Sequence, residues 1–141
     1  MRFENTLSIA RRPEDVFSYL ADFENVPMWN YAITETQKTS NGPVGIGTTY
    51  RQTRSIPSPA KETFTVTEFE PQHRLAIHGD LGPFQGTLSY ELEAIPEGTL
   101  LTNRAALEGK GLAKVAAPLL GGRVGDAVAA NLQKLKEILE T

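Results

Sequence analysis

The fold is decided by the last stretch of the chain, Leu112–Glu140, which reads LAKVAAPLLGGRVGDAVAANLQKLKEILE. Apolar residues recur in it every three to five positions, a spacing that places them in one stripe along a helix. The stripe consists of Leu112, Val115, Ala116, Leu119, Val124, Val128, Leu132, Leu135 and Leu139. Because an apolar stripe must be buried, we expect the rest of the chain to supply a layer that covers it.

The middle of this predicted helix carries only small side chains where a core helix is normally bulky. The small residues are Gly121, Gly122, Gly125, Ala127, Ala129 and Ala130. We therefore expect a cavity to begin there, while Leu132–Leu139 packs the core. Pro118 removes one helical hydrogen bond, which predicts a bend near 117–121.

The residues before this helix read mostly as strands. Phe3, Leu7 and Ile9 alternate with polar residues, the period of a half-buried strand. Two short helices should follow, one from Pro13 and one over Phe23–Trp29. Six more strands are predicted at 31–39, 46–54, 61–69, 73–79, 84–95 and 99–108.

Short turns rich in Gly and Pro separate these six strands, so no crossover helix fits between them. The strands should therefore pair antiparallel with their neighbours as a meander. We predict an α+β fold in which a curved, seven-stranded antiparallel sheet wraps around the long C-terminal helix, with two short helices between the first two strands. Residues 1–141 should form a single domain.

Composition excludes several classes of protein. The net charge is −3 and the 14 basic residues are dispersed, which argues against a nucleic-acid partner. There is no cysteine, so disulfides, thiolate nucleophiles and cysteine metal sites are excluded. The N-terminus lacks the apolar run of a signal peptide and no segment is apolar for ~20 residues, so we expect a cytoplasmic protein without a membrane span.

Three segments carry a resemblance to a known family: PEDVFSYLADFENVPMWN, FTVTEFEPQHRLAIHGD and GTLLTNRAALEGKGL. With the order of elements, they resemble the START-like (SRPBCC, Bet v 1-like) superfamily, and most of all its polyketide cyclase/dehydrase and lipid-transport branch. The resemblance implies a helix-grip fold with an apolar cavity between the sheet and the C-terminal helix. Members include carriers of lipids and hydrophobic metabolites as well as cyclases and dehydratases, so it does not imply one activity.

Strand alternation predicts which side chains face the helix. In 99–108 the inward set is Leu101, Asn103, Ala105 and Leu107. Asn103 would then be a buried amide that binds a ligand or water, or that is satisfied by a neighbouring group of the chain. In the preceding strand the inward residues are Leu88, Tyr90 and Leu92. Tyr90 then either orients a ligand or hydrogen-bonds within the core.

The same reasoning extends the candidate ligand-binding set to the middle strands. Tyr50 and Gln52 share one face of the strand 46–54. In the strand 61–69, Phe64 and Val66 share the inward face, and the same alternation predicts that Glu68 also points inward. A buried Glu68 would be a weak catalytic candidate, as would Tyr90. The full ligand-binding set is Trp29, Tyr50, Gln52, Phe64, Val66, Leu88, Tyr90, Asn103, Leu119, Gly122 and Ala129.

No motif of a metal or cofactor site appears. His73 and His78 lie on a turn and on an outward strand position, without a zinc-ligand spacing. We predict no metal and no cofactor. Arg51, Arg54 and Arg123 are possible partners of an anion or enolate, but we expect all three to be solvated.

Two functions remain open. The first is carriage or sequestration of a small hydrophobic molecule, such as a lipid or a polyketide, in the cavity. The alternative is a cyclase or dehydratase that uses acid-base chemistry in the same cavity. A protein-binding role of the outer sheet face is a third possibility. The sequence decides neither the ligand, nor catalysis, nor the oligomeric state.

Overall fold

The computed structural model describes residues 1–114 and 122–141. Within these ranges the chain forms one seven-stranded antiparallel sheet, in the order β1-β7-β6-β5-β4-β3-β2. The strands are β1 (Arg2–Ile9), β2 (Ile33–Lys38), β3 (Thr49–Arg54), β4 (Ala60–Glu70), β5 (Arg74–Leu81), β6 (Phe84–Ile95) and β7 (Gly98–Gly109). The predicted meander is confirmed, and β1 joins the sheet as an edge strand by pairing with β7.

Helices fill the connection between β1 and β2 and follow β7. They are α1 (Pro13–Ala21), the short 3₁₀ turn η1 (Phe23–Asn25), α2 (Val26–Trp29) and α3 (Ala113–Glu140). Pro13 opens α1 and is followed by Glu14 and Asp15, which favour the positive end of a helix dipole. The predicted α+β architecture with a long C-terminal helix is therefore confirmed.

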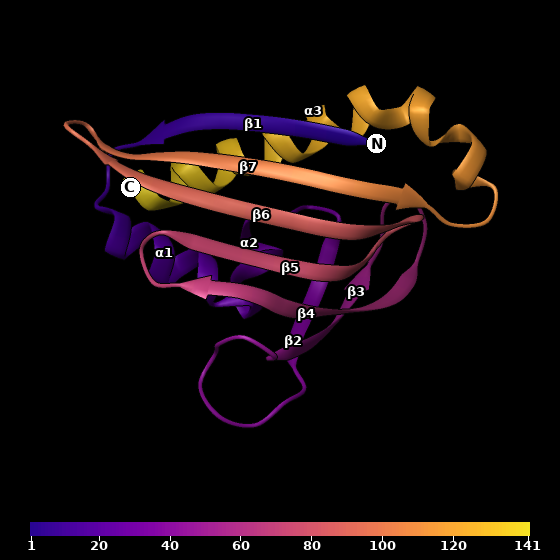
Figure 1. Ribbon diagram of the computed structural model, residues 1–141, viewed down its shortest axis with the longest axis horizontal. Coiled ribbons are helices and arrows are strands. Elements are labelled where there is room, and N and C mark those ends of the chain that lie inside the picture. The colour runs from indigo at the N-terminus through magenta and orange to yellow at the C-terminus, as the bar shows by residue number, and fades with distance from the viewer.

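Helix α3 crosses one face of the sheet, behind β1, β7 and β6 in Figure 1, and it contacts β1, β7 and α2. Leu132, Leu135 and Leu139 are almost fully buried, as predicted for the half of the helix that packs the core. Leu112, which we assigned to the same stripe, is 95% exposed because it precedes the helix in a turn. The bend predicted near Pro118 falls outside the described residues.

The packed core lies between α1, α2, the last turns of α3 and the sheet. Aromatic rings stand at its side near β3 and β4, with Phe23 edge-on to both Tyr50 and Phe64. Tyr50 and Phe64 stack with their centroids 5.1 Å apart. The buried residues of this packed core are Ile9, Val16, Phe17, Leu20, Ala21, Phe23, Val26, Trp29, Ile33, Tyr50, Phe64, Val66, Leu75, Ile77, Tyr90, Leu92, Leu101, Leu132, Leu135 and Leu139.

A β-bulge in β4 overturns one prediction. Val66 pairs with Ile77, but the next pair is Glu68 with Ala76, so the register shifts between them. A bulge inserts one residue into the alternation and exchanges the faces beyond it. Glu68 therefore points outward, and Phe69 instead packs inward against Phe17 with ring centroids 5.3 Å apart.

Candidate functional site

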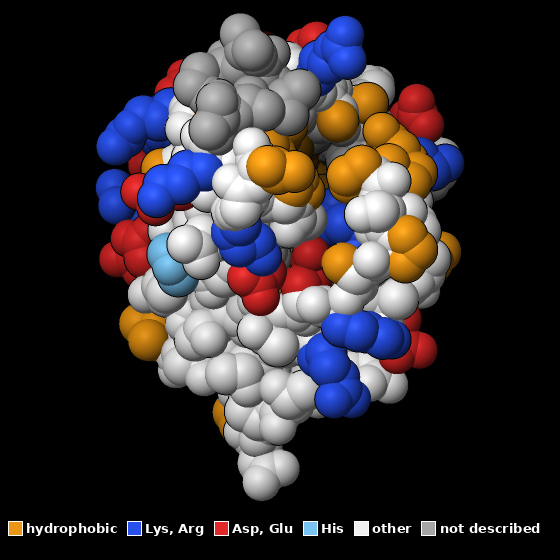
Figure 2. Space-filling model, turned by 90° about the vertical axis from the view of Figure 1, so that its right-hand side faces the viewer, with side chains coloured by type: hydrophobic (Ala, Val, Ile, Leu, Met, Phe, Trp, Pro, Cys, Tyr) orange, Lys and Arg blue, Asp and Glu red, His pale blue; other side chains and the backbone are white. Residues whose placement is uncertain are grey.

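A cavity of about 360 Å³ opens beside the N-terminal part of the helical residues 122–140, next to the packed core. Its walls are mostly apolar. They come from α3, from strands β1, β3, β5, β6 and β7, from the turn between β5 and β6, and from the loops before β2 and after β3. They consist of Phe3, Asn30, Tyr31, Ala32, Arg54, Ile56, Pro57, Leu81, Pro83, Phe84, Leu88, Leu107, Arg123, Val124, Ala127, Val128 and Asn131. Figure 2 shows a hollow rimmed by hydrophobic side chains, with acidic and basic side chains next to it.

Burial rises steadily along the part of α3 that lines the cavity. Arg123 is exposed, Val124, Ala127 and Val128 are half-buried, and Asn131 is buried. The next residue, Leu132, already belongs to the packed core. The cavity therefore has its mouth near Arg123 and its closed end near Asn131. The sequence predicted a cavity along this part of the helix, and of the small residues on which that prediction rested, Ala127 lines the cavity.

A buried ion pair forms one wall. The Arg54 side chain is 12% exposed and the Glu62 side chain 2% exposed. Nε and Nη2 of Arg54 donate to the Glu62 carboxylate at 2.9 to 3.1 Å. Gln52 Nε2 adds a bond of 2.6 Å to Glu62 Oε1, and the Gly82 backbone N–H adds one of 2.8 Å to Oε2. Such complete pairing is what permits two charges to be buried.

This ion pair also fixes two loops at the cavity mouth. Arg54 Nη1 donates to the Ile56 carbonyl in the loop after β3. Glu62 accepts from Gly82 in the turn after β5. Both loops contribute residues to the cavity wall. The ion pair therefore holds these two loops, which form the rim of the cavity, through their backbone atoms, and it also closes one side of the cavity.

Neither member of the ion pair was predicted as a buried residue. Arg54 was expected to be solvated, and this is wrong, because it has the same strand parity as the buried Tyr50 and Gln52. Glu62 was overlooked, although it shares the parity of Phe64 and Val66. The signal that could have found them is opposite charge at inward positions of neighbouring antiparallel strands. As predicted, Arg51 is exposed.

Asn131 carries a second polar feature at the closed end of the cavity. The residue is only 6% exposed, and its Oδ1 has no hydrogen-bond partner among the described residues. A buried acceptor without a partner costs about 1 to 3 kcal/mol. Asn131 was not among the predicted site residues, because the helical stripe was read from apolar positions only.

Of the residues predicted to contact a ligand, Leu88 lines this cavity. Trp29, Tyr50, Phe64, Val66 and Tyr90 lie in the packed core instead. Gln52 reaches the site indirectly through its bond to Glu62, and it also faces Thr36 Oγ1 at 3.4 Å. Most of the predicted ligand-binding residues of the sheet and the short helices therefore lie in the packed core beside the cavity and not in its wall.

Three predicted positions lie on α3. Gly122 is exposed, and a Cβ added there would meet nothing within 4 Å. Ala129 is half-buried but is not part of the cavity wall. On a helix of 3.6 residues per turn, the wall positions 124, 127, 128 and 131 form a face that excludes 122 and 129. The side chain of Leu119 lies outside the described residues.

Asn103 is fully buried, as predicted. Its Nδ2 donates to the Ser89 carbonyl on β6 at 3.3 Å, and its Oδ1 has no partner in the described part of the chain. Asn103 does not line the cavity. The protein itself satisfies the amide nitrogen of Asn103.

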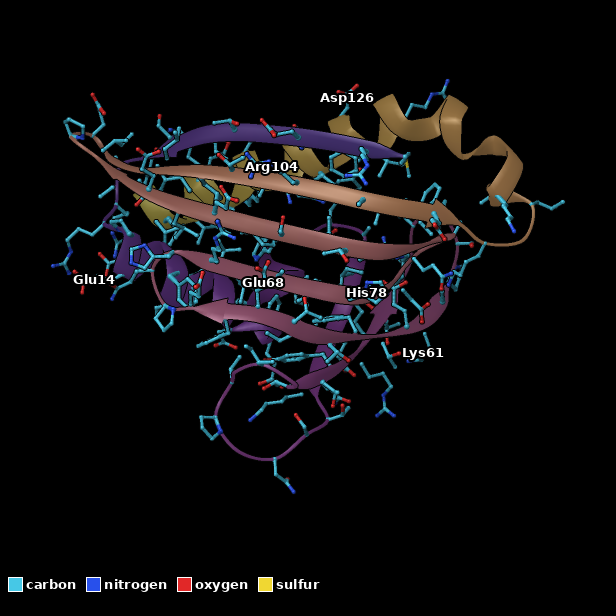
Figure 3. The ribbon with its side chains drawn as sticks, in the orientation of Figure 1. Glu14, Lys61, Glu68, His78, Arg104 and Asp126 are labelled. Carbon is cyan, nitrogen blue, oxygen red and sulfur yellow. The ribbon has the colours of Figure 1, made fainter. Side chains whose placement is uncertain are left out.

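The two candidate catalytic groups are not at the cavity. Figure 3 labels Glu68 among the side chains of the sheet, and its side chain is 49% exposed, 3.8 Å from Arg74. Burial raises the pKa of the Tyr90 phenol well above its usual range, so that the phenol keeps its proton. Burial first, and then Asp22 and Glu24, raise the pKa of Tyr50 to about 12.

The histidines lie as predicted. His73 and His78 are exposed, and His78 Nδ1 is 2.9 Å from Thr87 Oγ1. No cluster of three His, Cys, Asp or Glu side chains with metal-binding geometry occurs among residues 1–114 and 122–141. Over the same residues, no helix is both long and apolar enough to cross a membrane.

Comparison with known proteins places the chain in a sequence family. A family model described as polyketide cyclase / dehydrase and lipid transport matches residues 1–140. The uncharacterized protein Rv2574 of Mycobacterium tuberculosis H37Rv is 34% identical over 106 residues, which are 71% of this chain and 61% of that protein. The chain thus spans about three-fifths of the length of the curated relatives it matches.

Solved structures share the fold at low sequence identity. The crystal structure of TTHA0849 from Thermus thermophilus aligns with a TM-score of 0.77 and 17% identity, over 99% of this chain and 95% of that chain. The Zhui aromatase/cyclase from Streptomyces sp. R1128 aligns with a TM-score of 0.77 and 13% identity, over 99% and 93% of the two chains. At such identities the likeness establishes the fold alone.

Proposed function

We propose that this chain, which belongs to the polyketide cyclase / dehydrase and lipid transport family, binds a small hydrophobic molecule in the cavity beside α3. The observation that carries the proposal is the cavity of about 360 Å³, with a mostly apolar wall and few polar groups. This volume lies within the range of about 300 to 1,000 Å³ typical of small-molecule sites. A lipid or a polyketide has the required apolar surface.

Apolar burial supplies the binding free energy. Each Å² of ligand surface that leaves water contributes about 25 cal/mol before the costs of association. Phe3, Phe84, Leu88 and Leu107 offer such a surface on the sheet side, and Val124 and Val128 offer it on the helix side. Carriage or sequestration requires no proton-transfer group, and the two candidate catalytic side chains do not reach this cavity.

The experiment is native mass spectrometry of the protein purified without detergent, for the wild type and Ala127→Leu. Ala127 lines the cavity, so a leucine there should fill it and remove any co-purified ligand mass. Ala130→Leu is the matched control, because Ala130 is exposed and is not part of the wall. Binding elsewhere is indicated if both variants retain the ligand equally.

A cyclase or dehydratase is the second candidate, favoured by Arg54. Arg54 carries five N–H donors, of which Glu62 and the Ile56 carbonyl take three, so a remaining N–H could donate to a ketone or enolate oxygen of a polyketone. The test adds the protein to a polyketide synthase that releases a poly-β-ketone chain. A changed pattern of ring-closed products with the wild type, and its loss in the double variant Arg54→Met with Glu62→Leu, which leaves no buried charge unpaired, would support catalysis if ligand binding is retained. An unchanged pattern with the wild type excludes it.

A further inference from the structure

From the exposed side chains around the cavity mouth we infer an interaction surface: this end of the protein docks on a lipid bilayer with anionic headgroups, so that the cavity opens toward the membrane. The inference goes beyond the proposed function, because it concerns the surface outside the cavity. We call this surface the mouth surface. It consists of the apolar residues Tyr31, Ile56 and Leu112 and the cations Lys61, Lys114 and Arg123.

Three large apolar side chains stand out from the loops at this end. Tyr31 before β2 is 60% exposed, Ile56 after β3 is 46% exposed and Leu112 after β7 is 95% exposed. Tyr31 and Ile56 line the cavity. Leu112 lies at the same end, because the N–H of Lys110 in its loop donates to the carbonyl of the wall residue Pro83 at 2.9 Å. Exposed apolar side chains gathered at one opening are a mark of an interaction surface.

Three basic side chains accompany them. Arg123 lines the mouth on α3, Lys114 follows the loop that holds Leu112, and Lys61 follows the loop that holds Ile56. All three cations are exposed, and none forms a salt bridge within residues 1–114 and 122–141. Figure 2 faces this end and shows Lys and Arg side chains on several sides of the hollow.

The other charged groups of this end balance one another. They form two salt bridges, Arg54 with Glu62 and Lys110 with Asp80, and leave Glu108 and Asp126 against Arg2 and the N-terminal amine. The cations of the mouth surface are therefore an excess of positive charge at one end of a chain whose net charge is −3. Such a local excess favours an anionic partner.

A bilayer with anionic headgroups fits this combination better than a second copy of the chain. At a membrane interface Lys and Arg meet the headgroups, a tyrosine lies at the boundary, and aliphatic side chains enter the apolar layer. A second copy docked about a two-fold axis would instead bring the same cations against each other. The bilayer also lets a hydrophobic ligand reach the cavity without crossing water.

The first test is co-sedimentation of the protein with vesicles of phosphatidylcholine, alone or with about 30% phosphatidylglycerol. Each exposed cation near an anionic surface should strengthen binding about fivefold, so three of them should give the anionic vesicles an advantage of about a hundredfold. Raising the salt from about 0.1 M to about 0.5 M should remove most of this advantage, because a shorter Debye length screens the cations. Equal binding to both kinds of vesicle, or to neither, overturns the inference.

Charge reversal locates the contact. Lys114→Glu should weaken binding to the anionic vesicles at least about fivefold. Lys134→Glu is the matched control, because Lys134 is an exposed cation near the other end of the same helix and forms no salt bridge with a described residue. It changes the net charge equally and should weaken binding less than about twofold. Equal losses in both variants would show that only the net charge matters, which overturns the mouth surface.

A fluorescent label tests the orientation. Because the chain has no cysteine, Leu112→Cys and Ile46→Cys can each carry one polarity-sensitive fluorophore. Ile46 is the matched position, since it is 72% exposed but belongs to the loop between β2 and β3, below the sheet in Figure 1. On anionic vesicles the emission should shift to the blue at Leu112 and stay unchanged at Ile46. An equal shift at both positions, or none at Leu112, contradicts the orientation.

Ala127→Leu separates this inference from the proposed function. The variant should bind anionic vesicles as the wild type does, because Ala127 lines the cavity and the mouth surface is unchanged, while it loses any co-purified ligand. A wild type that keeps its ligand but binds no vesicles overturns the inference alone. If the protein binds no vesicles and is a dimer that Leu112→Ser dissociates, a second copy covers the mouth and the inference is wrong.

Discussion

The packed core and the cavity lie along one helix and against one sheet, yet they are built in opposite ways. Over Leu132–Leu139, α3 presents leucines that are almost fully buried against the sheet and the short helices. Over Arg123–Asn131 it presents an alanine, two valines, an asparagine and an arginine, and about 360 Å³ stays open. Side-chain volume on α3 therefore decides where this fold is solid and where it can hold a ligand.

The largest expected difference between the two regions is in the cost of removing apolar volume. Leu135→Ala should lower the free energy of unfolding by about 4 kcal/mol, because Leu135 is fully buried in the packed core. Val128→Ala should cost about 1 kcal/mol, since its side chain borders open space. Urea denaturation of both variants measures this, and equal losses would contradict the distinction.

The ion pair in the cavity wall should show a strong coupling between its members. Glu62→Leu should cost about 3 kcal/mol, because it leaves Arg54 buried and unpaired. Adding Arg54→Met should restore most of that loss, since no buried charge then remains. A double-mutant cycle by denaturation measures the coupling. Additive losses would mean that the pair is solvated and does not hold the rim.

The two regions should also differ in how they tolerate added side-chain volume. Ala21→Leu should cost about 2 kcal/mol, because Ala21 is buried in the packed core and a larger side chain overpacks it. Ala127→Leu should change stability by less than about 1 kcal/mol, because the cavity can accept the side chain. Thermal unfolding compares the two. A costly Ala127→Leu would show that the cavity is not open at this position.

A further prediction concerns the alkaline titration of the packed core. The folded protein raises the pKa of Tyr50 to about 12, whereas an unfolded tyrosine titrates near 10. The stability that this adds is complete below about pH 10 and is lost as pH rises toward 12, because the unfolded chain loses its proton first. Tyr50→Phe should therefore flatten the fall of unfolding free energy between these pH values. An identical fall in the variant would contradict a raised pKa.

Strand alternation and turn residues sufficed to predict the sheet, because each strand has one buried face and each connection is too short for a helix. The same alternation failed at Glu68, since a bulge between Val66 and Glu68 leaves no mark in the residue pattern. It could have found Glu62 and Arg54, whose parities match their buried neighbours. The cavity wall itself could not be predicted, because it depends on how the turns at Ile56 and Gly82 meet α3 in space.

Ligand should enter the region lined by Arg123–Asn131 and leave the packed core untouched. The most direct measurement is a two-dimensional ¹H–¹⁵N spectrum of the protein titrated with 2-naphthol. The account predicts that the amide shifts concentrate at Leu107, Ala127, Val128 and Asn131, and that Leu20 and Leu135 do not move. Shifts confined to the core residues, or an unchanged spectrum at saturating probe, would contradict it.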